Sequence, residues 1–170
     1  MKTPPSFSST FAPVPLELLS WLRHTDVMTD RLKSYAPQVS LKILEHDWVE
    51  ANAWELKYLG IEGSLLRRNV LIQSQNQPCW YARTMIPNTT YQRAPEFFDR
   101  LHQEPLAHLI YDEPRVTRCW IYSYGISPSQ PEWLWWANLQ YLAIERLWMR
   151  VSAFQFDQDD FFYLAELFLL

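Results

Sequence analysis

The sequence predicts an α+β fold in which a single antiparallel β-sheet of about six strands packs against helices on one side. First, runs with apolar residues at alternate positions recur along the chain, and polar turns typical of hairpins join several of them. Second, segments with helical spacing are inserted between these runs. Third, 48% of the 170 residues are hydrophobic and 16% are aromatic, enough for one sizeable core. A sheet covered on one side leaves room for a ligand between sheet and helices.

The first third of the chain is predicted to contain a loose arm, two short helices and the first strand. Residues 1–14 are rich in proline and serine and are expected to form the arm, which leaves residues 15–170 as a single domain. A helix is expected over residues 16–22, where leucines recur on one face, and a second over residues 28–35. The period then changes to two, which predicts a strand over residues 39–50.

The rest of the chain is predicted to contain five further strands and three helical segments. The strands are expected over residues 65–72, 80–86, 116–124, 148–156 and 161–169, and the helices over residues 95–102, 105–111 and 132–147. The polar turns at residues 73–78 and 157–160 join strands into hairpins. Residues 51–63 are interpreted as a mixed connection and residues 127–131 as a linker.

Charge and composition argue against several classes of function. The formal net charge of −4 makes general affinity for nucleic acid or for an anionic membrane unexpected. The four histidines show no metal-ligand spacing with cysteines or acids, and no glycine-rich phosphate loop occurs, so neither a metal nor a cofactor is expected. Cys79 and Cys119 are expected to be reduced thiols. With no secretory signal and no apolar segment long enough to span a bilayer, the protein is predicted to be cytoplasmic.

Arg68 is the first candidate for a site residue. In a strand over residues 65–72, a period of two places it on one face with Leu66, Val70 and Ile72. That face is otherwise apolar, so the guanidinium is expected to point inward, where an unpaired charge is costly. It therefore needs an anionic partner, which is either a ligand or a carboxylate of the core.

Glu166 is the second candidate, because it interrupts an almost wholly apolar strand. It shares a face with Phe162 and Leu164. A lone acid in such a place is either paired or ionises abnormally, and both situations are common in active sites. The simplest alternative is a structural ion pair with Arg68 or with Arg83. Arg83 lies in another predicted strand and raises the same question.

Several short motifs together resemble the chorismate pyruvate-lyase family over about Leu16 to Leu170. In chain order the motifs are Trp21-Leu22, Asp26-Val27-Met28-Thr29, Leu66-Arg67-Arg68, Ala82-Arg83-Thr84-Met85-Ile86-Pro87, Pro105-Leu106, Trp148-Met149-Arg150-Val151-Ser152 and Ala165-Glu166-Leu167-Phe168-Leu169. No single motif is specific, and the resemblance lies in their order and spacing. The interval from Arg68 to Arg83 fits the family without a gap.

The resemblance implies a fold and a site. The fold is an antiparallel sheet with two helical flaps over a buried ligand pocket. Arg68 is implied to bind the carboxylate of an aromatic product, and Glu166 to lie by the product's hydroxyl group, so both are candidate catalytic residues. The backbone at Met28 and Leu106, on the two flaps, is implied to complete the substrate-binding set.

The resemblance also implies a reaction, the cofactor-free elimination of pyruvate from chorismate to give 4-hydroxybenzoate. In this family that product typically feeds ubiquinone biosynthesis, as the first committed step. Two routes stay open. In one, the ring proton passes within the substrate to the enolpyruvyl methylene; in the other, Glu166 acts as a general acid or base. Monomer is the default expectation for the oligomeric state.

Three departures from the family pattern stand out, and two other functions are considered. Ala107 replaces the usual glycine of the second flap, Met149 replaces a small residue, and residues 126–147 form a longer segment unusually rich in tryptophan. One alternative function is a non-catalytic sensor of small aromatic acids with the same fold, although such repressors carry a basic DNA-binding domain ahead of the sensor. The other is an interaction protein that uses the tryptophan-rich segment as its contact surface.

Overall fold

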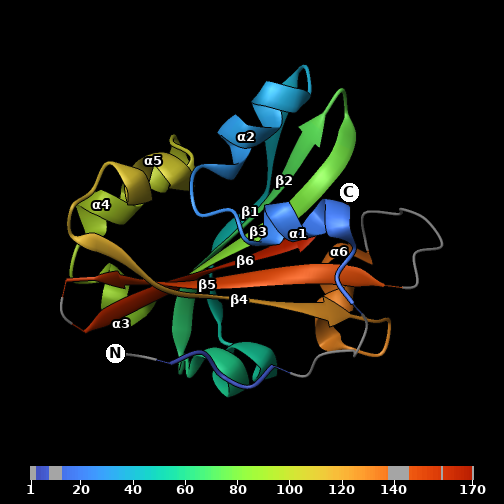
Figure 1. Ribbon diagram of the computed structural model, residues 1–170. Coiled ribbons are helices and arrows are strands. Elements are labelled where there is room, and N and C mark those ends of the chain that lie inside the picture. The colour runs from blue at the N-terminus through green and yellow to red at the C-terminus, as the bar shows by residue number, and fades with distance from the viewer. Residues whose placement is uncertain (1–2, 8–12, 138–145, 158, 170) are drawn as a thin grey trace.

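The centre of the structure is one open six-stranded antiparallel sheet (Figure 1). The computed structural model describes residues 3–7, 13–137, 146–157 and 159–169. In spatial order the strands are β1 (Val39–Glu50), β2 (Ser64–Ser74), β3 (Gln77–Pro87), β6 (Asp160–Phe168), β5 (Leu147–Phe156) and β4 (Val116–Ile126). The α+β class, the single sheet and the six strands are therefore confirmed.

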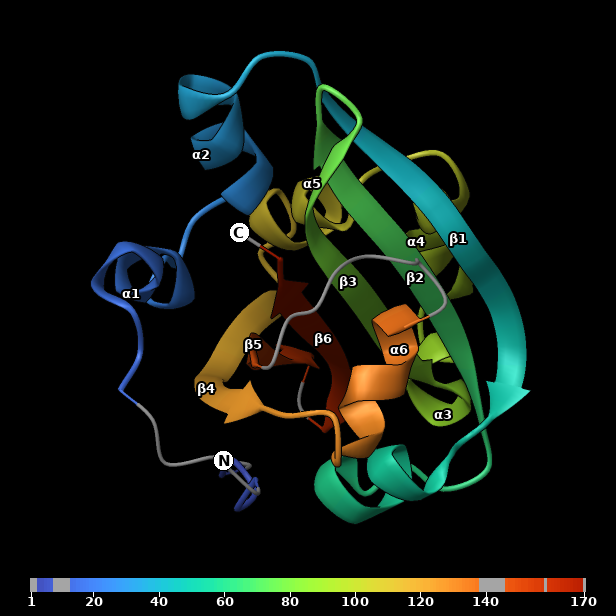
Figure 2. The same cartoon turned by 90° about the vertical axis from the view of Figure 1, so that its right-hand side faces the viewer.

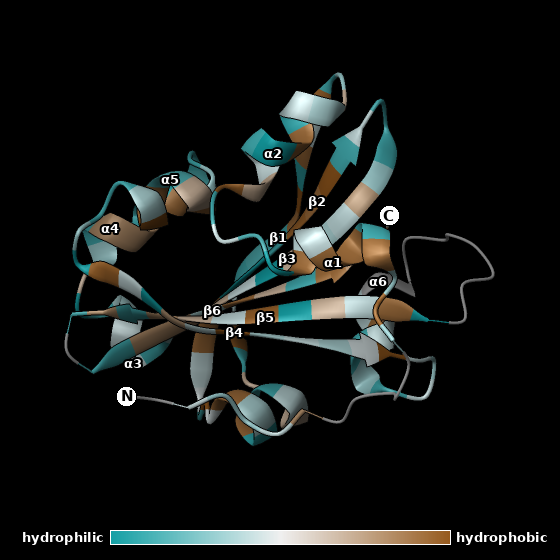
Figure 3. Cartoon of the chain, viewed as in Figure 1, coloured by the Kyte–Doolittle hydropathy of each residue, from teal (hydrophilic) through white to brown (hydrophobic). Residues whose placement is uncertain are grey.

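The sheet consists of two three-stranded units, β1–β2–β3 and β4–β5–β6, joined where β3 pairs with β6. The β2–β3 hairpin turns at Gln75 and Asn76, both with positive φ (50° and 65°), as two-residue hairpin loops require. The strands extend further into the predicted polar turn than expected. In Figure 3 the turn between β2 and β3 has the hydrophilic colour, whereas apolar residues follow the strands. The pairing of β3 with β6 brings together segments that are far apart in the sequence.

Four of the helices pack on one face of the sheet. They are α1 (Leu16–Leu22), α2 (Met28–Tyr35), α4 (Pro95–Asp99) with the short helix η2 (Arg100–His102), and α5 (Leu106–Tyr111). Leucines and phenylalanines of these helices are buried against Val70, Trp80, Phe154 and Phe162 of the strands. The helices predicted at residues 16–22, 28–35 and 105–111 are confirmed. A further helix, α3 (Asn88–Tyr91), follows Pro87 and was not expected.

The opposite face of the sheet is also covered. The π-helix η1 (Glu55–Leu59), the short helix η3 (Pro131–Trp133) and α6 (Leu134–Ala137) belong to this side, together with residues of the N-terminal arm (Figure 2). The prediction of helices on one side holds for α1, α2, α4 and α5 but is wrong for these segments. The physical reason is that strands β3, β5 and β6 are apolar on both faces, so each face needs cover.

Phe7 anchors the arm that was expected to be loose. Its side chain is only 6% exposed, and its ring stacks on those of Tyr58, Tyr122 and Tyr124 at centroid distances of 5.1, 5.1 and 4.8 Å. Aromatic pairs at these distances add to the free energy gained by burial. Phe7 is therefore part of the packed structure, whereas Thr3, Pro4 and Ser6 are exposed.

The tryptophan-rich segment is described in part. In the predicted 132–147 helix, residues 132–137 are helical and residues 138–145 lie outside the described part, whereas Leu147 already belongs to β5, so the predicted end of the helix is wrong. Trp135 packs edge-on against Trp54 at 4.8 Å, which supports packing as one role of this segment. Cys79 and Cys119 are both free thiols. Among the described helices, none has the length and apolar character needed to cross a membrane.

We expect Phe7→Ala to lower the free energy of unfolding by about 3 kcal/mol, because it removes a buried aromatic ring and leaves a cavity among three others. Urea denaturation of the full chain measures this value. Leu16→Ala is the matched control, since Leu16 is 84% exposed and its truncation should change stability little. Equal midpoints for Phe7→Ala and the parent protein would show that the arm does not contribute to folding.

Candidate functional site

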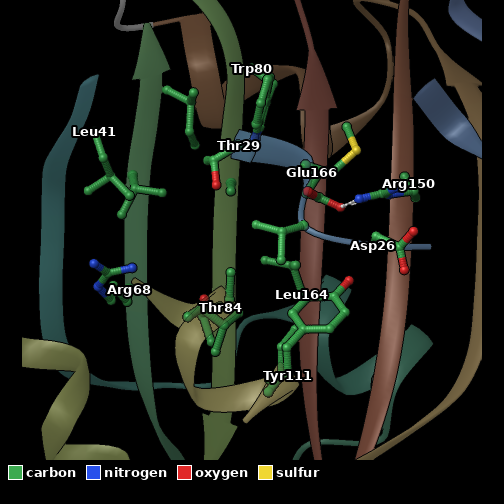
Figure 4. A pocket seen from close by; sticks show the side chains of 18 of the residues that line it. Asp26, Thr29, Leu41, Arg68, Trp80, Thr84, Tyr111, Arg150, Leu164 and Glu166 are labelled. Carbon is green, nitrogen blue, oxygen red and sulfur yellow. Dashed lines mark hydrogen bonds and ion pairs between the residues drawn. The ribbon is translucent and has the colours of Figure 1, made fainter. Parts of the chain in front are cut away.

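A small pocket lies between one face of the sheet and the segments above it (Figure 4). Strand side chains form its floor: Leu41, Arg68, Val70, Ile72, Trp80, Ala82, Thr84, Arg118, Arg150, Leu164 and Glu166. Residues 26–29, which lead into α2, and residues of α5 lie above them and are called the roof below. The volume is about 80 Å³, and the walls are mostly apolar. Such a space suits a small ligand with few polar groups.

Arg68 points into this pocket from β2, as predicted. Its side chain is only 4% exposed, and within the described part of the chain it forms no ion pair and its Nε atom has no hydrogen-bond partner. Burial lowers the pKa of Arg68, although an arginine stays protonated at neutral pH. A buried guanidinium without a partner is costly. Arg68 is therefore a candidate residue for binding an anion.

Glu166 also lines the pocket, two strands away on β6. It is 3% exposed and pairs with Arg150, which lies directly opposite on β5; Arg150 Nε donates to Glu166 Oε2 at 2.7 Å. Figure 4 shows Arg68 on one side of the pocket and this pair on the other. The alternative that Glu166 pairs with Arg68 or Arg83 is wrong, because the partner is Arg150.

Arg150 is a site residue that the sequence reasoning did not single out. It is 2% exposed, and its Nη1 donates to the carbonyl oxygens of Trp21 at 3.2 Å and His24 at 2.7 Å. The signal was present in the sequence. A period of two in residues 147–156 places Arg150 on one face with Trp148 and Phe154, the same pattern that identified Arg68.

Arg83 is on the opposite face of the sheet and does not reach the pocket. Its Nε donates to Asn69 Oδ1 at 3.0 Å and its Nη2 to the Tyr81 hydroxyl at 3.1 Å. Its guanidinium also lies 3.9 Å from the ring centre of Trp135 and 3.9 Å from Glu55 Oε1. Arg83 therefore belongs to a buried network of the second face. The sequence left open whether Arg83 pairs with a ligand or with another residue. In the structure its partners are residues of the protein.

The roof contains both residues for which backbone contacts were expected. Met28 is the first residue of α2 and Leu106 the first of α5, and both are buried and line the pocket. Backbone N–H groups in the first turn of a helix have no partner within the helix, so they are free to donate. Ala107 follows inside α5 with an ordinary helical φ, so this helix does not require the glycine that the family usually has.

The two parts of the roof are fastened to each other and to the sheet edge. The Tyr111 hydroxyl of α5 donates to the carbonyl oxygen of Thr25, just before residues 26–29. Arg118 of β4 donates to the same carbonyl oxygen at 2.6 Å and to the Tyr111 hydroxyl at 3.1 Å. These bonds hold both roof segments over the pocket.

A pair of stacked histidines lies next to Arg68. His46 of β1 is directly opposite Arg68 in the sheet register, and its ring stacks on His102 at 4.1 Å with an interplanar angle of 9°. Burial lowers the pKa of His46, and the nearby His102 and Arg68 lower it further. Among the described residues, no cluster of three or more His, Cys, Asp or Glu side chains could hold a metal ion.

Comparison with known proteins identifies relatives along the chain. The family model described as Chorismate lyase matches residues 7–170. A probable chorismate pyruvate-lyase from Pseudoalteromonas translucida is 28% identical over 112 residues, which cover 65% of this chain and 62% of that protein. The chorismate pyruvate-lyase of Pectobacterium carotovorum is 22% identical over 112 residues, 65% of this chain and 63% of that protein. The chain thus spans less than two thirds of the length of these two relatives.

Solved structures share the fold. The C-terminal domain of the histidine utilization repressor from Pseudomonas syringae matches with a TM-score of 0.58 and 14% identity over 77% of this chain and 91% of that chain. PhnF from Mycobacterium smegmatis matches with a TM-score of 0.59 and 16% identity over 86% of this chain and 64% of that chain. At these identities the likeness concerns the fold alone.

We expect stability to fall as the pH decreases from about 7.5 to 5.5, and His46 to cause part of the fall. Because the pKa of His46 is below 6.5 in the folded protein, the unfolded chain binds its proton first as the pH drops through 6.5, and unfolding is favoured. Urea unfolding at several pH values should give a shallower dependence for His46→Gln. Some slope should remain, since burial, and then Arg31, also lower the pKa of His24.

His108→Gln is the control for this experiment, because His108 is exposed on α5. Identical pH dependences for His46→Gln and the parent protein would contradict a role for the buried histidine.

Proposed function

The chain belongs to the chorismate lyase family, and on that premise we propose that it is a chorismate pyruvate-lyase, which converts chorismate to 4-hydroxybenzoate and pyruvate. One observation supports the proposal: Arg68, which is buried and has no ion pair within the described residues, shares a small pocket with Glu166. We further propose that the product serves ubiquinone biosynthesis, the general role of the family.

Arg68 supplies the recognition of a carboxylate. Its guanidinium has the planar set of donors that binds a carboxylate through two parallel, charge-assisted hydrogen bonds. An entering carboxylate exchanges its water for these donors and gives the buried charge its partner. Val70 and Ile72 on the same strand face provide the apolar surroundings in which such bonds are strong.

Glu166 is placed to interact with the opposite end of the same ligand. β2 and β6 are separated by one strand, β3, and Glu166 lies two residues along β6 from Leu164, which is level with Arg68, so the two residues are about 12 Å apart at the level of the backbone. Side chains from both strands point into the space between them, which leaves room for one six-membered ring with a polar group at each end. The apolar floor formed by Ala82 and Leu164 fits the flat face of such a ring.

The reaction needs little from the protein beyond position and exclusion of water. The ether bond between the ring and the enolpyruvyl group breaks, and its oxygen becomes the keto oxygen of pyruvate. The neighbouring ring carbon loses its proton, the enolpyruvyl methylene gains one, and the electrons of the C–H bond complete the aromatic ring. Aromatisation drives the reaction, and a closed pocket holds the reactive conformer.

Two proton routes fit this pocket. In the first, the proton passes directly from the ring to the methylene within the bound substrate. In the second, Glu166 takes part as a general acid or base. Neither route requires a metal or a cofactor.

We propose that the roof segments act as the two flaps of the family. The backbone at Met28 and Leu106 then completes the substrate site from above. The bonds among Thr25, Tyr111 and Arg118 must open for the product to leave, so slow release and product inhibition are expected. A cytoplasmic location, a monomeric state and the lack of nucleic-acid binding stay predictions.

The purified protein, freed of metal with a chelator, should release 4-hydroxybenzoate and pyruvate from chorismate in equal amounts. Chromatography of the aromatic product and a coupled assay for pyruvate measure this. Binding of 4-hydroxybenzoate without turnover of chorismate would instead support the alternative of a non-catalytic aromatic-acid binder. If neither binding nor turnover occurs, the proposed function is wrong.

We expect Arg68→Ala and Arg68→Met to lower kcat/KM by about 100-fold or more, because the substrate carboxylate loses its charged partner in a buried site. The Met variant should also be more stable than the parent, since an unpaired buried charge is replaced by an apolar side chain. Its free energy of unfolding, measured by urea denaturation, should be about 1 kcal/mol higher. Arg93→Ala, at an exposed arginine outside the pocket, is the control. Turnover like that of the parent in either Arg68 variant would exclude the assignment.

Glu166→Gln separates the two proton routes. If Glu166 transfers a proton, we expect kcat to fall by about 100-fold or more, because general acid–base catalysis contributes factors of this size. If the proton moves within the substrate, the loss should be modest, since the amide still forms a hydrogen bond. A pH profile of kcat measured beside the parent shows whether a titrating group disappears with the carboxylate.

A further inference from the structure

We propose that Arg150 is a positioning residue, which holds one oxygen of Glu166 so that the other faces a ligand hydroxyl, and which ties this carboxylate to the segment that leads into the roof. The inference rests on the function proposed above, because it assumes an aromatic acid with a hydroxyl group at the Glu166 end. Arg150 was not among the candidate site residues that the sequence indicated.

The two oxygens of the Glu166 carboxylate differ in their hydrogen bonds to Arg150. Both the Nε and the Nη2 atoms of Arg150 approach the same oxygen, Oε2 of Glu166. Among the described residues, Oε1 of Glu166 has no hydrogen-bond donor. A carboxylate can accept several hydrogen bonds, so Oε1 retains its capacity in a pocket that Glu166 lines. The guanidinium fixes the plane of the carboxylate and thereby the direction in which Oε1 accepts.

Charge gives a second reason for Arg150. A buried carboxylate alone would repel an anionic ligand and would itself be costly. Because Arg150 neutralises Glu166, the net charge of the three buried groups Arg68, Arg150 and Glu166 is positive by one unit. An aromatic monoanion then meets its cation at Arg68 and a neutralised acceptor at Glu166.

The remaining donor of Arg150 reaches the roof connection. Its Nη1 binds the carbonyl oxygens of Trp21 and His24, at the carboxyl end of α1 and just before residues 26–29. The carboxyl end of a helix attracts a cation. One rigid guanidinium thus contacts both the hydroxyl-binding end of the pocket and the base of the roof. A ligand that orders Glu166 therefore also favours the closed position of residues 26–29.

A pair of ligands tests this role without turnover. Benzoate and 4-hydroxybenzoate both carry the carboxylate for Arg68, and only the second carries the hydroxyl for Glu166. Isothermal titration calorimetry gives the ratio of their dissociation constants. The parent should prefer 4-hydroxybenzoate by about 10- to 100-fold, the size of one hydrogen bond to a charged group. In Arg150→Gln this ratio should fall close to one, and the affinity for benzoate should fall as well, because the carboxylate of Glu166 is then no longer neutralised.

Matched variants keep the test decisive. Glu166→Leu should show the same loss of preference with Arg150 intact, and Arg150→Lys, which keeps the charge but not the two-pronged geometry, should be intermediate. If Arg150→Gln does not fold, the Arg150→Lys ratio decides: a ratio equal to that of the parent overturns the proposal. Folded variants are recognised by an unchanged circular dichroism spectrum, so loss of structure is not mistaken for loss of positioning.

The outcomes separate this inference from the proposed function. A parent protein that prefers 4-hydroxybenzoate but leaves chorismate unchanged disproves the lyase reaction, and the ratio in the variants still decides the role of Arg150. An unchanged ratio in Arg150→Gln disproves the positioning role even where turnover is normal. A parent that binds both ligands equally, or neither, also overturns the inference.

Discussion

The structure depends on how three buried charges are balanced on one apolar face of the sheet. Arg150 and Glu166 neutralise each other across neighbouring strands, whereas Arg68 has no ion pair within the described residues. Water is displaced from this face by the helices above it, so the fold bears the cost of one unpaired cation. An anionic ligand, as proposed above, would offset this cost.

Successive side chains of a strand point to opposite faces of the sheet. One face lines the pocket, and the other is a structural face. On β3, Trp80, Ala82 and Thr84 face the pocket, whereas Tyr81 and Arg83 face the other side. There Arg67 and Glu55 form a bidentate pair with distances of 3.0 and 2.7 Å. Similar residue types therefore have different roles one position apart. On the second face both Arg67 and Arg83 contact the carboxylate of Glu55, whereas Arg68 on the pocket face has no ion pair within the described residues.

Much of the fold followed from local patterns, because period-two runs and polar turns are local properties. Arg68 and Glu166 were identified because each is the single charge on an otherwise apolar face of a predicted strand. The pairing of Glu166 with Arg150 depends on strand register, which no local pattern specifies. The bonds that fasten the roof join residues as far apart as Thr25 and Arg118, so sequence spacing contains no sign of them. Cover for the second face comes from short segments and one aromatic side chain, too brief to show periodicity.

The junction between β3 and β6 has a consequence for folding kinetics. Arg68 belongs to the unit β1–β2–β3, and Glu166 and Arg150 belong to the unit β4–β5–β6. Each unit has mostly hairpin contacts, which form early, whereas β3 and β6 pair residues as distant as Trp80 and Phe168. Such long loops close slowly. Neither half contains both Arg68 and Glu166, so the proposed ligand site forms only when the two halves pair.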